Sequence, residues 1–546
     1  MSSSFSLVAR DLARVRGGST VLDGVDVSVG PRTRLGVVGP NGVGKTTLLR
    51  LLAGLDRPDR GTVTRTPPSA RVGYLPQEPE RSPRETLLEF LARRTGVQAA
   101  GAELERTAAA LATPAAGADD EYSRALDDYL AAGGPDFEAR ARVACADLGL
   151  PVSLLHTPTA TLSGGQAARA SLAAILVSRF DIFLLDEPTN DLDFAGLARL
   201  ERFLDELAGG VVVVSHDRTF LERVVTHVLE LDEHDRSSTE FGGGWLGYLE
   251  ARATARRHAE EEYAVYTAHR TRLEARARTQ RQWAVDGVRT AKTRAPDHDK
   301  AQRDFRINSS ERQASKARAT EQAIARLEQV EKPWEGWDLR FTVAGAPRSG
   351  DVVLRLDGAV IERGDFRLGP VDLEIGWAER VAIVGANGSG KTTLLGALLG
   401  DLPLTAGERR IGPGVIVGEM DQARAAFADD RTLLDGFIAA TGLLTGEARS
   451  LLAKFGLGAD HVLRNTATLS PGERTRAVLA RFAAQGVNCL VLDEPTNHLD
   501  LPAIQQLEAA LDGYDGTLLL VSHDRALLDA VRVTRVITAS GEPVEV

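Results

Sequence analysis

The sequence predicts an α/β protein in which two related domains, each built on a parallel β-sheet, are joined by a long helical linker. Three observations indicate this organisation. A set of four short motifs occurs twice, in the same order, in the two halves of the 546 residues. Short apolar runs precede these motifs, as is typical of buried parallel strands that end in functional loops. The stretch between the halves is rich in Ala, Arg, Glu and Gln, which favours helix.

We expect the first domain, which we call the first cassette, to span residues 1–240. Its apolar runs LGVVG, IFLLDE and VVVVSHD predict buried strands, and helical stretches such as TTLLRLLAGL follow them. It also carries an insertion. Matching glutamines, Gln77 and Gln422, are 345 positions apart, whereas Ser163 and Ser470 are 307 apart, so the first copy holds 38 extra residues between these points.

The insertion, at about residues 95–135, is rich in Ala and acidic residues. We expect it to add helix and a mobile loop around Pro114 to Asp120. Two interpretations stay open: a functional arm and a tolerated surface insertion.

The linker, residues 241–335, is predicted to be an antiparallel helical hairpin. Its first helix is expected from Tyr248 to Arg289, where proline is absent, and its second from Glu311 to Glu331. The tip lies at about 290–312. Forty helical residues rise about 1.5 Å each and span roughly 60 Å, which is more than a tether between two domains requires.

The linker is basic although the chain as a whole is acidic. Residues 251–332 contain 19 Lys and Arg against 12 Asp and Glu, while the whole chain carries −11. Clustered cations can neutralise phosphates, and Arg or an aromatic ring can stack on bases, so we expect this hairpin to bind RNA. A solvated coiled coil is the alternative. We expect Trp283 to pack between the two helices. The candidate RNA-binding residues around the tip are Arg289, Lys292, Arg294, Lys300, Arg303, Phe305, Arg306, Arg312 and Lys316.

The second cassette is expected at residues 336–546, with strands in VAIVG, CLVLDE and LLLVSHD. No apolar run approaches the 18 residues of a membrane span, and the start MSSSFSLVARDL lacks the pattern of a secretory signal. Cys145 and Cys489 stand outside any CxxC pattern, which is typical of reduced cysteines. These features predict a cytoplasmic protein with no membrane contact.

The glycine-rich motifs GPNGVGKTT, from Gly39 to Thr47, and GANGSGKTT, from Gly385 to Thr393, predict two phosphate-binding loops. Glycines let backbone N–H groups curl around a phosphate at a helix N-terminus, Lys reaches the β- and γ-phosphates, and the next Thr ligates Mg²⁺. The predicted ATP-binding residues of these loops are Gly39, Asn41, Gly42, Gly44, Lys45, Thr46, Thr47, Gly385, Asn387, Gly388, Gly390, Lys391, Thr392 and Thr393.

The motifs LLDEPTNDLD and VLDEPTNHLD place an Asp-Glu pair at the end of an apolar strand in each cassette. Asp186 and Asp493 can orient a metal, and the Glu that follows can align or deprotonate a water. The His of each VSHD motif can contact the γ-phosphate. One such pair alone would be a weak signal, but four motifs in order, twice, predict ATP hydrolysis to ADP and phosphate with ATP and Mg²⁺. The predicted catalytic residues are Glu187, Glu494, His216 and His523.

With LSGGQ from Leu162 to Gln166 and LSPGE from Leu469 to Glu473, the chain resembles the ABC ATPase superfamily over nearly all of both cassettes. The resemblance implies two P-loop ABC nucleotide-binding domains, joined by an α-helical hairpin linker, that dimerise head to tail within one monomer. Each signature then completes the opposite site. The signature residues are Ser163, Gly165 and Gln166 for the Lys391 site, and Ser470, Gly472 and Glu473 for the Lys45 site. The family's remaining positions map onto Gln77 and Gln422, as Mg²⁺ ligands beside Thr46, Asp186, Thr392 and Asp493, and onto Asp193 and Asp500, as dimer contacts.

Two departures from the family pattern stand out. Pro471 replaces a glycine of the second signature and removes a backbone donor, which favours a less active signature. No aromatic residue lies about 23 positions before either phosphate loop, where many members stack adenine; Arg16 and Glu362 lie there instead.

Within the superfamily, the tandem cassettes, the charged helical linker and DEPTNHLD resemble the ABC-F group. The resemblance implies binding to the tRNA exit site of the 70S ribosome, with the hairpin reaching toward rRNA and the peptidyl-tRNA. Our leading interpretation is antibiotic resistance by ribosome protection. The alternatives are a housekeeping translation factor and the ATP-binding subunit of a transporter; DNA handling is a weaker one.

Overall fold

The protein is described by a computed structural model, which divides it into two compact units, Met1–Gly247 with Trp337–Val546, and Tyr248–Gly336. The structure describes residues 5–77, 82–112, 117–190, 192–233, 235–293, 312, 315, 316, 318–327, 348–364, 366–420, 427, 430–497 and 499–542. At residues 284, 287–293 and 471 it describes the backbone only.

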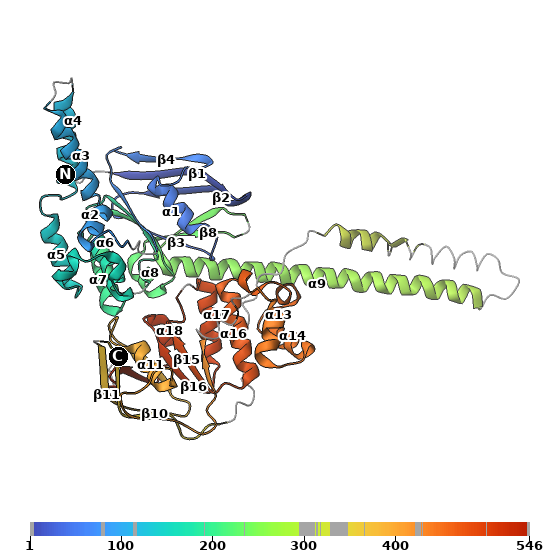
Figure 1. Ribbon diagram of the computed structural model, residues 1–546. Coiled ribbons are helices and arrows are strands. Elements are labelled where there is room, and N and C mark those ends of the chain that lie inside the picture. The colour runs from blue at the N-terminus through green and yellow to red at the C-terminus, as the bar shows by residue number, and fades with distance from the viewer. Residues whose placement is uncertain are drawn as a thin grey trace. The chain divides into compact units, whose positions relative to one another are not determined.

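The first cassette contains the predicted parallel sheet (Figure 1). Its strand order is β5-β6-β7-β3-β8-β9, parallel up to β8, with β9 antiparallel at the edge. The strands are β3 (Arg34–Val38), β5 (Val72–Leu75), β6 (Ile182–Asp186), β7 (Gly210–Val214), β8 (His227–Leu231) and β9 (Ser238–Gly242). Strands β3, β6 and β7 are buried along their whole length, which explains why their sequences are continuous apolar runs.

A second, antiparallel sheet of the first cassette has the order β2-β1-β4. It consists of β1 (Ser6–Arg16), β2 (Ser19–Val29) and β4 (Arg60–Thr66). Three helices follow the carboxyl ends of parallel strands and their motif loops: α1 (Lys45–Ala53), α7 (Phe194–Glu206) and α8 (Arg218–Val224). The signature begins a fourth, α6 (Gly164–Val177), which precedes β6 in the chain. Leu48, Leu49 and Leu52 of α1 pack into the core formed with β3 and β7.

Helices fill the insertion region: α2 (Leu87–Arg94), α3 (Val97–Ala110), α4 (Ala118–Ala131) and α5 (Phe137–Asp147). Helices α3 and α4 lie against each other (Figure 1). Arg106 of α3 pairs with Glu121 of α4 at 3.6 Å. The expected loop up to Asp120 is wrong at its end, because Ala118 to Asp120 already form the first turn of α4. Acidic residues in this turn favour the positive end of the helix dipole. Residues 113–116 of that loop lie outside the described part.

The second cassette repeats the architecture, with a parallel sheet in the order β14-β15-β16-β12-β17 and an antiparallel sheet in the order β11-β10-β13. The strands are β10 (Val352–Arg363), β11 (Phe366–Gly376), β12 (Arg380–Val384), β13 (Ala406–Ile411), β14 (Val417–Glu419), β15 (Cys489–Asp493), β16 (Thr517–Val521) and β17 (Arg535–Thr538). The helices are α11 (Lys391–Leu399), α13 (Leu433–Thr441), α14 (Thr445–Lys454), α15 (Ala459–Val462), α16 (Pro471–Gln485), α17 (Leu501–Asp512) and α18 (Arg525–Ala530).

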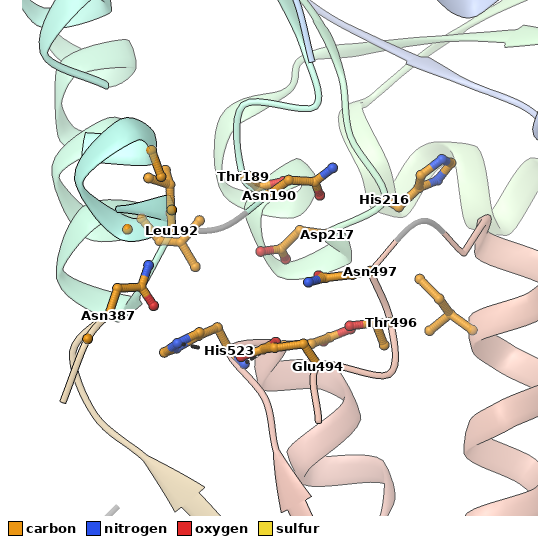
Figure 2. A pocket seen from close by; sticks show the side chains of 17 residues that line it. Thr189, Asn190, Leu192, His216, Asp217, Asn387, Glu494, Thr496, Asn497 and His523 are labelled. Atoms are coloured by element: carbon orange, nitrogen blue, oxygen red, sulfur yellow. Dashed lines mark hydrogen bonds and ion pairs between the residues drawn. The ribbon is translucent and has the colours of Figure 1, made fainter. Parts of the chain in front are cut away.

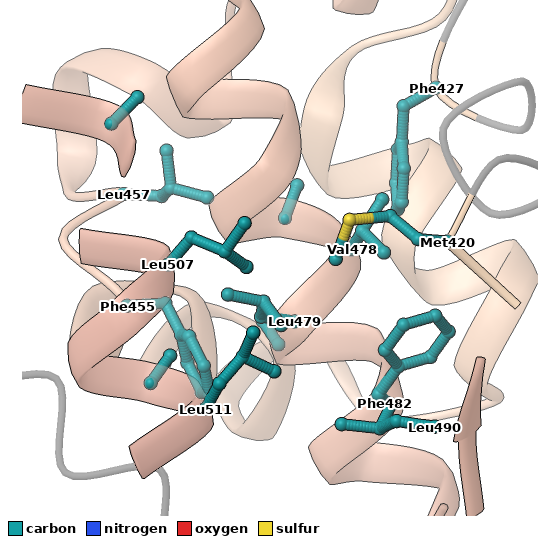
Figure 3. Close-up of a cluster of buried hydrophobic side chains, with 14 of the residues drawn as sticks. Met420, Phe427, Phe455, Leu457, Val478, Leu479, Phe482, Leu490, Leu507 and Leu511 are labelled. Atoms are coloured by element: carbon teal, nitrogen blue, oxygen red, sulfur yellow. The ribbon is translucent and has the colours of Figure 1, made fainter. Parts of the chain in front are cut away.

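A buried cluster holds α16 and α17 in place (Figure 3). Val478, Leu479 and Phe482 of α16 pack in it with Leu507 and Leu511 of α17. Because α16 starts at the second signature and α17 starts just after Asp500, this core fixes where both motifs lie.

Helix α9 (Gly244–Thr293) begins at the end of the first unit and continues through the linker unit, and it is longer at both ends than the predicted helix (Figure 1). Residues 318–325 are also helical and pair with α9: Thr320 donates to Gln280 Oε1 at 2.9 Å, and Arg281 lies 2.6 Å from Glu321. The expectation for Trp283 is wrong, since its side chain is 59% exposed while Gln280 and Thr320 occupy the buried seam. Among the described helices, none is long and apolar enough to cross a membrane.

Candidate functional site

Both predicted phosphate loops lead into a helix whose first residue is the motif lysine. The N-cap residues Gly44 and Gly390 have φ of 114° and 100°, a conformation that favours glycine. Lys45 Nζ donates to the Gly39 carbonyl at 2.8 Å, and Lys391 Nζ donates to the Gly385 carbonyl at 2.9 Å. The loops thus curl around their lysines, and the free N–H groups at each helix start form a cradle suited to phosphate.

A cavity of about 540 Å³ lies at the first phosphate loop, a size that suits a small-molecule ligand. It brings together residues of three of the four motifs of the first cassette and Gln77, with Thr496 and Leu499 contributed by the second. The predicted site residues that line it are Asn41, Gly42, Gly44, Lys45, Thr46, Thr47, Gln77, Asp186, Glu187 and His216. The site is therefore composite, but the residues that the second cassette contributes are not the expected Ser470, Gly472 and Glu473.

Hydroxyl and carboxylate oxygens meet where Mg²⁺ was predicted. Tyr74 donates to Asp186 Oδ2 at 3.3 Å, and the Thr46 hydroxyl also bonds to this carboxylate. Burial raises the pKa of Asp186, and these two hydrogen bonds oppose the shift. In the second cassette Thr392 donates to Asp493 Oδ2 at 2.8 Å. Oxygen donors of this kind, one carboxylate per site, fit Mg²⁺ shared with phosphates.

The predicted catalytic carboxylates sit in a strained backbone conformation. Glu187 and Glu494 have φ of 48° and 44°, and each backbone N–H donates to the last residue of the next strand, Val214 or Val521, at 2.9 Å. Non-glycine residues adopt such angles at a cost, which is met mainly at functional sites. Burial, with Asp186 nearby, raises the pKa of Glu187 to about 7 against the opposing charge of Lys45. A carboxylate with this pKa can accept a proton from water near neutral pH.

Each predicted histidine faces its glutamate. His216 Nε2 lies 3.3 Å from Glu187 Oε1, and His523 Nε2 lies 3.6 Å from Glu494 Oε1. Burial, with a smaller contribution from the nearby lysines, lowers the pKa of His216 to about 3 and that of His523 to about 4. Both imidazoles are therefore neutral at physiological pH, so each can donate one hydrogen bond and accept another.

Asp193 and Asp500 connect the cassettes. Asn387 N–H donates to Asp193 Oδ2 and Asn41 N–H donates to Asp500 Oδ2, each at 3.1 Å. The other oxygen of each carboxylate caps the helix that follows in its own cassette, α7 or α17. Each carboxylate thus ties the start of one helix to the phosphate loop of the opposite cassette.

The signature motifs begin helices α6 and α16 in the same way. Ser163 with Gln166, and Ser470 with Glu473, form capping boxes. Pro471 takes the first helical position, where its missing N–H costs nothing, so the helix start is intact. Lower activity of this signature stays a prediction.

The two signatures differ in what they contact. A Cβ on Gly165 would lie 3.0 Å from Asn387 Cβ, so this signature glycine lies against the opposite phosphate loop. A Cβ on Gly472 would instead meet Ala503 of its own cassette at 3.0 Å. Among the described residues, none of the second signature lines the cavity at Lys45. The structure therefore brings only the first signature to its expected partner.

A second cavity, of about 320 Å³, lies between the cassettes and is lined by both histidines (Figure 2). Sequence reasoning missed Thr189, Asn190, Thr496 and Asn497, which line it. Their recurrence at a constant offset of 307 in both copies was the available signal. Arg16 was noted only for its position, and it lines the cavity at Lys45.

Some predicted residues lie outside the described part: Gln422, Arg294, Lys300, Arg303, Phe305 and Arg306. Arg289 and Lys292 belong to α9, with the backbone alone described. Arg312 and Lys316 are described and exposed.

Comparison with known proteins shows the family of the two cassettes. The family model described as ABC transporter matches residues 22–190 and 368–497. The tylosin resistance ATP-binding protein TlrC of Streptomyces fradiae is 38% identical over 520 residues, 93% of this chain and 92% of the relative. The energy-dependent translational throttle protein EttA of Escherichia coli K12 is 31% identical over 521 residues, 94% of this chain and 88% of the relative.

Among solved structures, an archaeal ribosome recycling factor, aABCE1, in complex with the ribosomal stalk protein aP1, shares the fold. The TM-score is 0.55 at 20% identity, over 97% of this chain and 87% of that protein.

Proposed function

Since this chain belongs to the ABC-F family of ABC ATPases, we propose that it is a ribosome-binding ATPase. ATP closes the cassettes and favours the ribosome-bound form, and hydrolysis to ADP and phosphate releases the protein. In this proposal the cassettes are residues 1–240 and 336–546, and the linker is residues 241–335. The protein acts as a monomer, because one chain supplies both cassettes. It acts in the cytoplasm.

The chemistry follows from the residues around each cavity. Glu187 and Glu494 accept a proton from the attacking water, and the neutral His216 and His523 hold the γ-phosphate by hydrogen bonding. Lys45 and its counterpart bind the phosphates. Mg²⁺, which neutralises charge on the phosphate oxygens, would be held by Thr46, Gln77 and Asp186 in one site and by Thr392, Gln422 and Asp493 in the other.

The observation that carries the proposal is the reciprocal contact of Asp193 and Asp500 with the opposite phosphate loops. A loop that binds ATP is also the loop that receives the other cassette's carboxylate. Nucleotide at the loop and the closed arrangement of the cassettes are therefore coupled, which is what an ATP-dependent clamp needs.

A ribosomal partner is supported by the relatives and the linker. The two relatives compared above are, by their names, a translational throttle and a tylosin resistance protein. The linker carries 19 Lys and Arg between residues 251 and 332, and such a density of cations suits rRNA and tRNA phosphates. We assign the contact with rRNA and peptidyl-tRNA in the tRNA exit site to the tip, including Arg312 and Lys316.

The test uses the chain with Glu187→Gln and Glu494→Gln together. This double variant keeps the binding residues but loses proton acceptance, so it should co-sediment with 70S ribosomes in ATP through a sucrose gradient. The same variant in ADP, and the unchanged chain in ATP, are the controls and should sediment less with ribosomes. A double variant that stays free of ribosomes in ATP contradicts the proposal.

The similarity to TlrC, at 38% identity against 31% for EttA, favours resistance by ribosome protection. Expression of the gene should then raise the concentration of tylosin that inhibits growth, with lincosamides and pleuromutilins tested beside it. Unchanged susceptibility together with altered initiation or elongation would favour a housekeeping translation factor, and the name of EttA, a translational throttle protein, points to translation.

The matching family model is described as ABC transporter, which keeps a transporter subunit as a second candidate. That role requires a separate membrane protein. Co-purification with a membrane partner that survives deletion of residues 285–315 would favour it.

A further inference from the structure

One aromatic residue of the first cassette contacts the histidine of the second. The rings of Phe194 and His523 meet edge to face, with centroids 5.2 Å apart and an interplanar angle of 78°. Phe194 is the first residue of α7 and follows Asp193 directly. Because Asp193 binds the backbone of Asn387 in the second cassette, the same short segment brings both side chains to the Lys391 site.

The Phe194 ring is held on another side by a cation. The Arg525 guanidinium lies 5.6 Å from the ring centroid, and Arg525 Nη1 also pairs with Glu201 Oε1 at 3.2 Å. Glu201 belongs to α7, as Phe194 does, whereas Arg525 and His523 belong to the second cassette. Phe194 of the first cassette therefore contacts two side chains of the second.

The His523 ring has few polar restraints. Its Nε2 faces Lys391 Nζ at 3.1 Å and Glu494 Oε1 at 3.6 Å. Its Nδ1 is buried and has no hydrogen-bond partner among the described residues. In catalytic histidines the partner of the second nitrogen usually sets the ring orientation. For His523, packing against the Phe194 ring provides this restraint instead.

The other copy lacks this contact. The position that matches Phe194, 307 residues later, is Leu501, the first residue of α17. His216 Nδ1 is likewise buried without a hydrogen-bond partner among the described residues, and the residue of the second cassette that matches Phe194 has no ring. The two ATP sites therefore differ in how their histidine is held.

We propose that Phe194 is a positioning residue that acts in trans: it orients His523, so that the Lys391 site hydrolyses ATP efficiently only when α7 of the first cassette is docked. This inference rests on the role assigned to His523 in the proposed function. As a consequence, ATP hydrolysis at the Lys391 site depends on a ring contact with the opposite cassette, and the Lys45 site does not have this contact.

The test is Phe194→Leu, which gives the first copy the residue of the second. In a Glu187→Gln background, where turnover reports the Lys391 site, kcat should fall about two- to tenfold, the range expected when an aromatic pair is lost. The KM for ATP should stay within about twofold, because bound ATP contacts His523 rather than Phe194. Phe194→Tyr, which keeps the ring, should restore kcat.

Three controls separate positioning from a general loss of structure. In a Glu494→Gln background, where turnover reports the Lys45 site, Phe194→Leu should leave kcat unchanged. The thermal unfolding midpoint should match that of the parent chain. The Leu and Tyr variants of Phe194 are also measured without either Gln change, so that the comparison stands even if one Glu→Gln change silences both sites.

An unchanged kcat in Phe194→Leu, a rise in KM alone, an equal fall at both sites, or failure of Phe194→Tyr to restore turnover overturns the inference. A chain with both Glu→Gln changes that still hydrolyses ATP at the full rate refutes the roles in the proposed function, and the inference falls with them. Loss of turnover in that chain, with no effect of Phe194→Leu, refutes the inference alone.

Discussion

Two ion pairs across the cassette interface are related by the internal repeat. Arg218 pairs with Glu508, and Arg525 pairs with Glu201 at 3.2 Å. The two Arg residues are 307 positions apart in the sequence, and so are the two Glu residues, which is the offset of the repeat. The Glu508 and Glu201 side chains are only 12% and 14% exposed. We expect these pairs to stabilise the closed arrangement.

The magnitude follows from this geometry. Two charges about 3.2 Å apart attract by about 5 kcal/mol at an effective dielectric constant of about 20. Desolvation of two half-buried groups and ordering of the Arg side chain offset most of this attraction. Loss of one carboxylate should therefore cost about 1–2 kcal/mol of closure free energy, or about 5- to 30-fold in the closure equilibrium. Glu201 also pairs with Arg223 of its own cassette at 2.8 Å, so Glu508→Gln is the cleaner change.

The assay is fluorescence energy transfer between labels on the two cassettes, in the chain with Glu187→Gln and Glu494→Gln so that ATP persists. Glu508→Gln should raise the ATP concentration for half-maximal closure by about 5- to 30-fold. The matched control is Glu206→Gln on the exposed end of α7, which should change it less than about twofold. If Glu508→Gln shifts closure no more than this control does, the ion pairs do not stabilise the interface and the reasoning is refuted.

Two further predictions concern the first site. Burial holds the pKa of Glu187 near 7, above its ordinary 4.5, so the charged carboxylate destabilises the nucleotide-free fold above pH 7, and this cost disappears as pH falls below 4.5. In thermal unfolding, Glu187→Gln should therefore stabilise the nucleotide-free chain by about 1–3 kcal/mol at pH 8 and by almost nothing at pH 4.5. Glu494→Gln should stabilise it less, because the Glu494 side chain is 26% exposed whereas that of Glu187 is 6% exposed. Equal stabilisation by Glu187→Gln at both pH values would contradict this prediction. Gly44→Ala should abolish ATP binding, measured by nucleotide fluorescence titration, because the new Cβ would meet Val21 Cγ1 at 2.8 Å. Gly42→Ala, which has open space at its Cβ, should weaken binding far less. Equal losses of affinity would show that backbone strain at positive φ dominates, and not the collision.

The fold and the individual motifs could be predicted because their signals are local. Continuous apolar runs predicted the parallel strands, and the glycines before Lys45 and Lys391 predicted the two loops. The first turn of α4 was missed because the Ala- and Asp-rich stretch around Ala118 to Asp120 lacks the apolar periodicity that marks a helix. Trp283 was misplaced because the buried seam of the linker is polar, formed by Gln280 and its hydrogen-bonded threonine.

Contacts between the cassettes could not be predicted from local pattern. Asp193 and Asn387 are 194 residues apart, and their hydrogen bond exists only because two separately folded cassettes dock. The family resemblance supplied the dimer-contact role of the aspartate but not its second function as a helix cap. Phe194 was overlooked because a bulky residue after a cap is ordinary at a helix start. Its signal lay in the difference between the copies, Phe against Leu501, rather than in either copy alone.

The differences between the copies all point to the same site. The Lys391 site faces the unaltered LSGGQ signature, whose Gly165 lies against the loop residue Asn387, and its histidine is packed against an aromatic ring. The signature expected to complete the Lys45 site carries Pro471, and its Gly472 faces its own cassette instead. Two of these differences are substitutions, Pro471 and Phe194, and the third is a difference in how Gly165 and Gly472 pack. Since each one favours assembly at Lys391, we expect the Lys391 site to hydrolyse ATP faster than the Lys45 site.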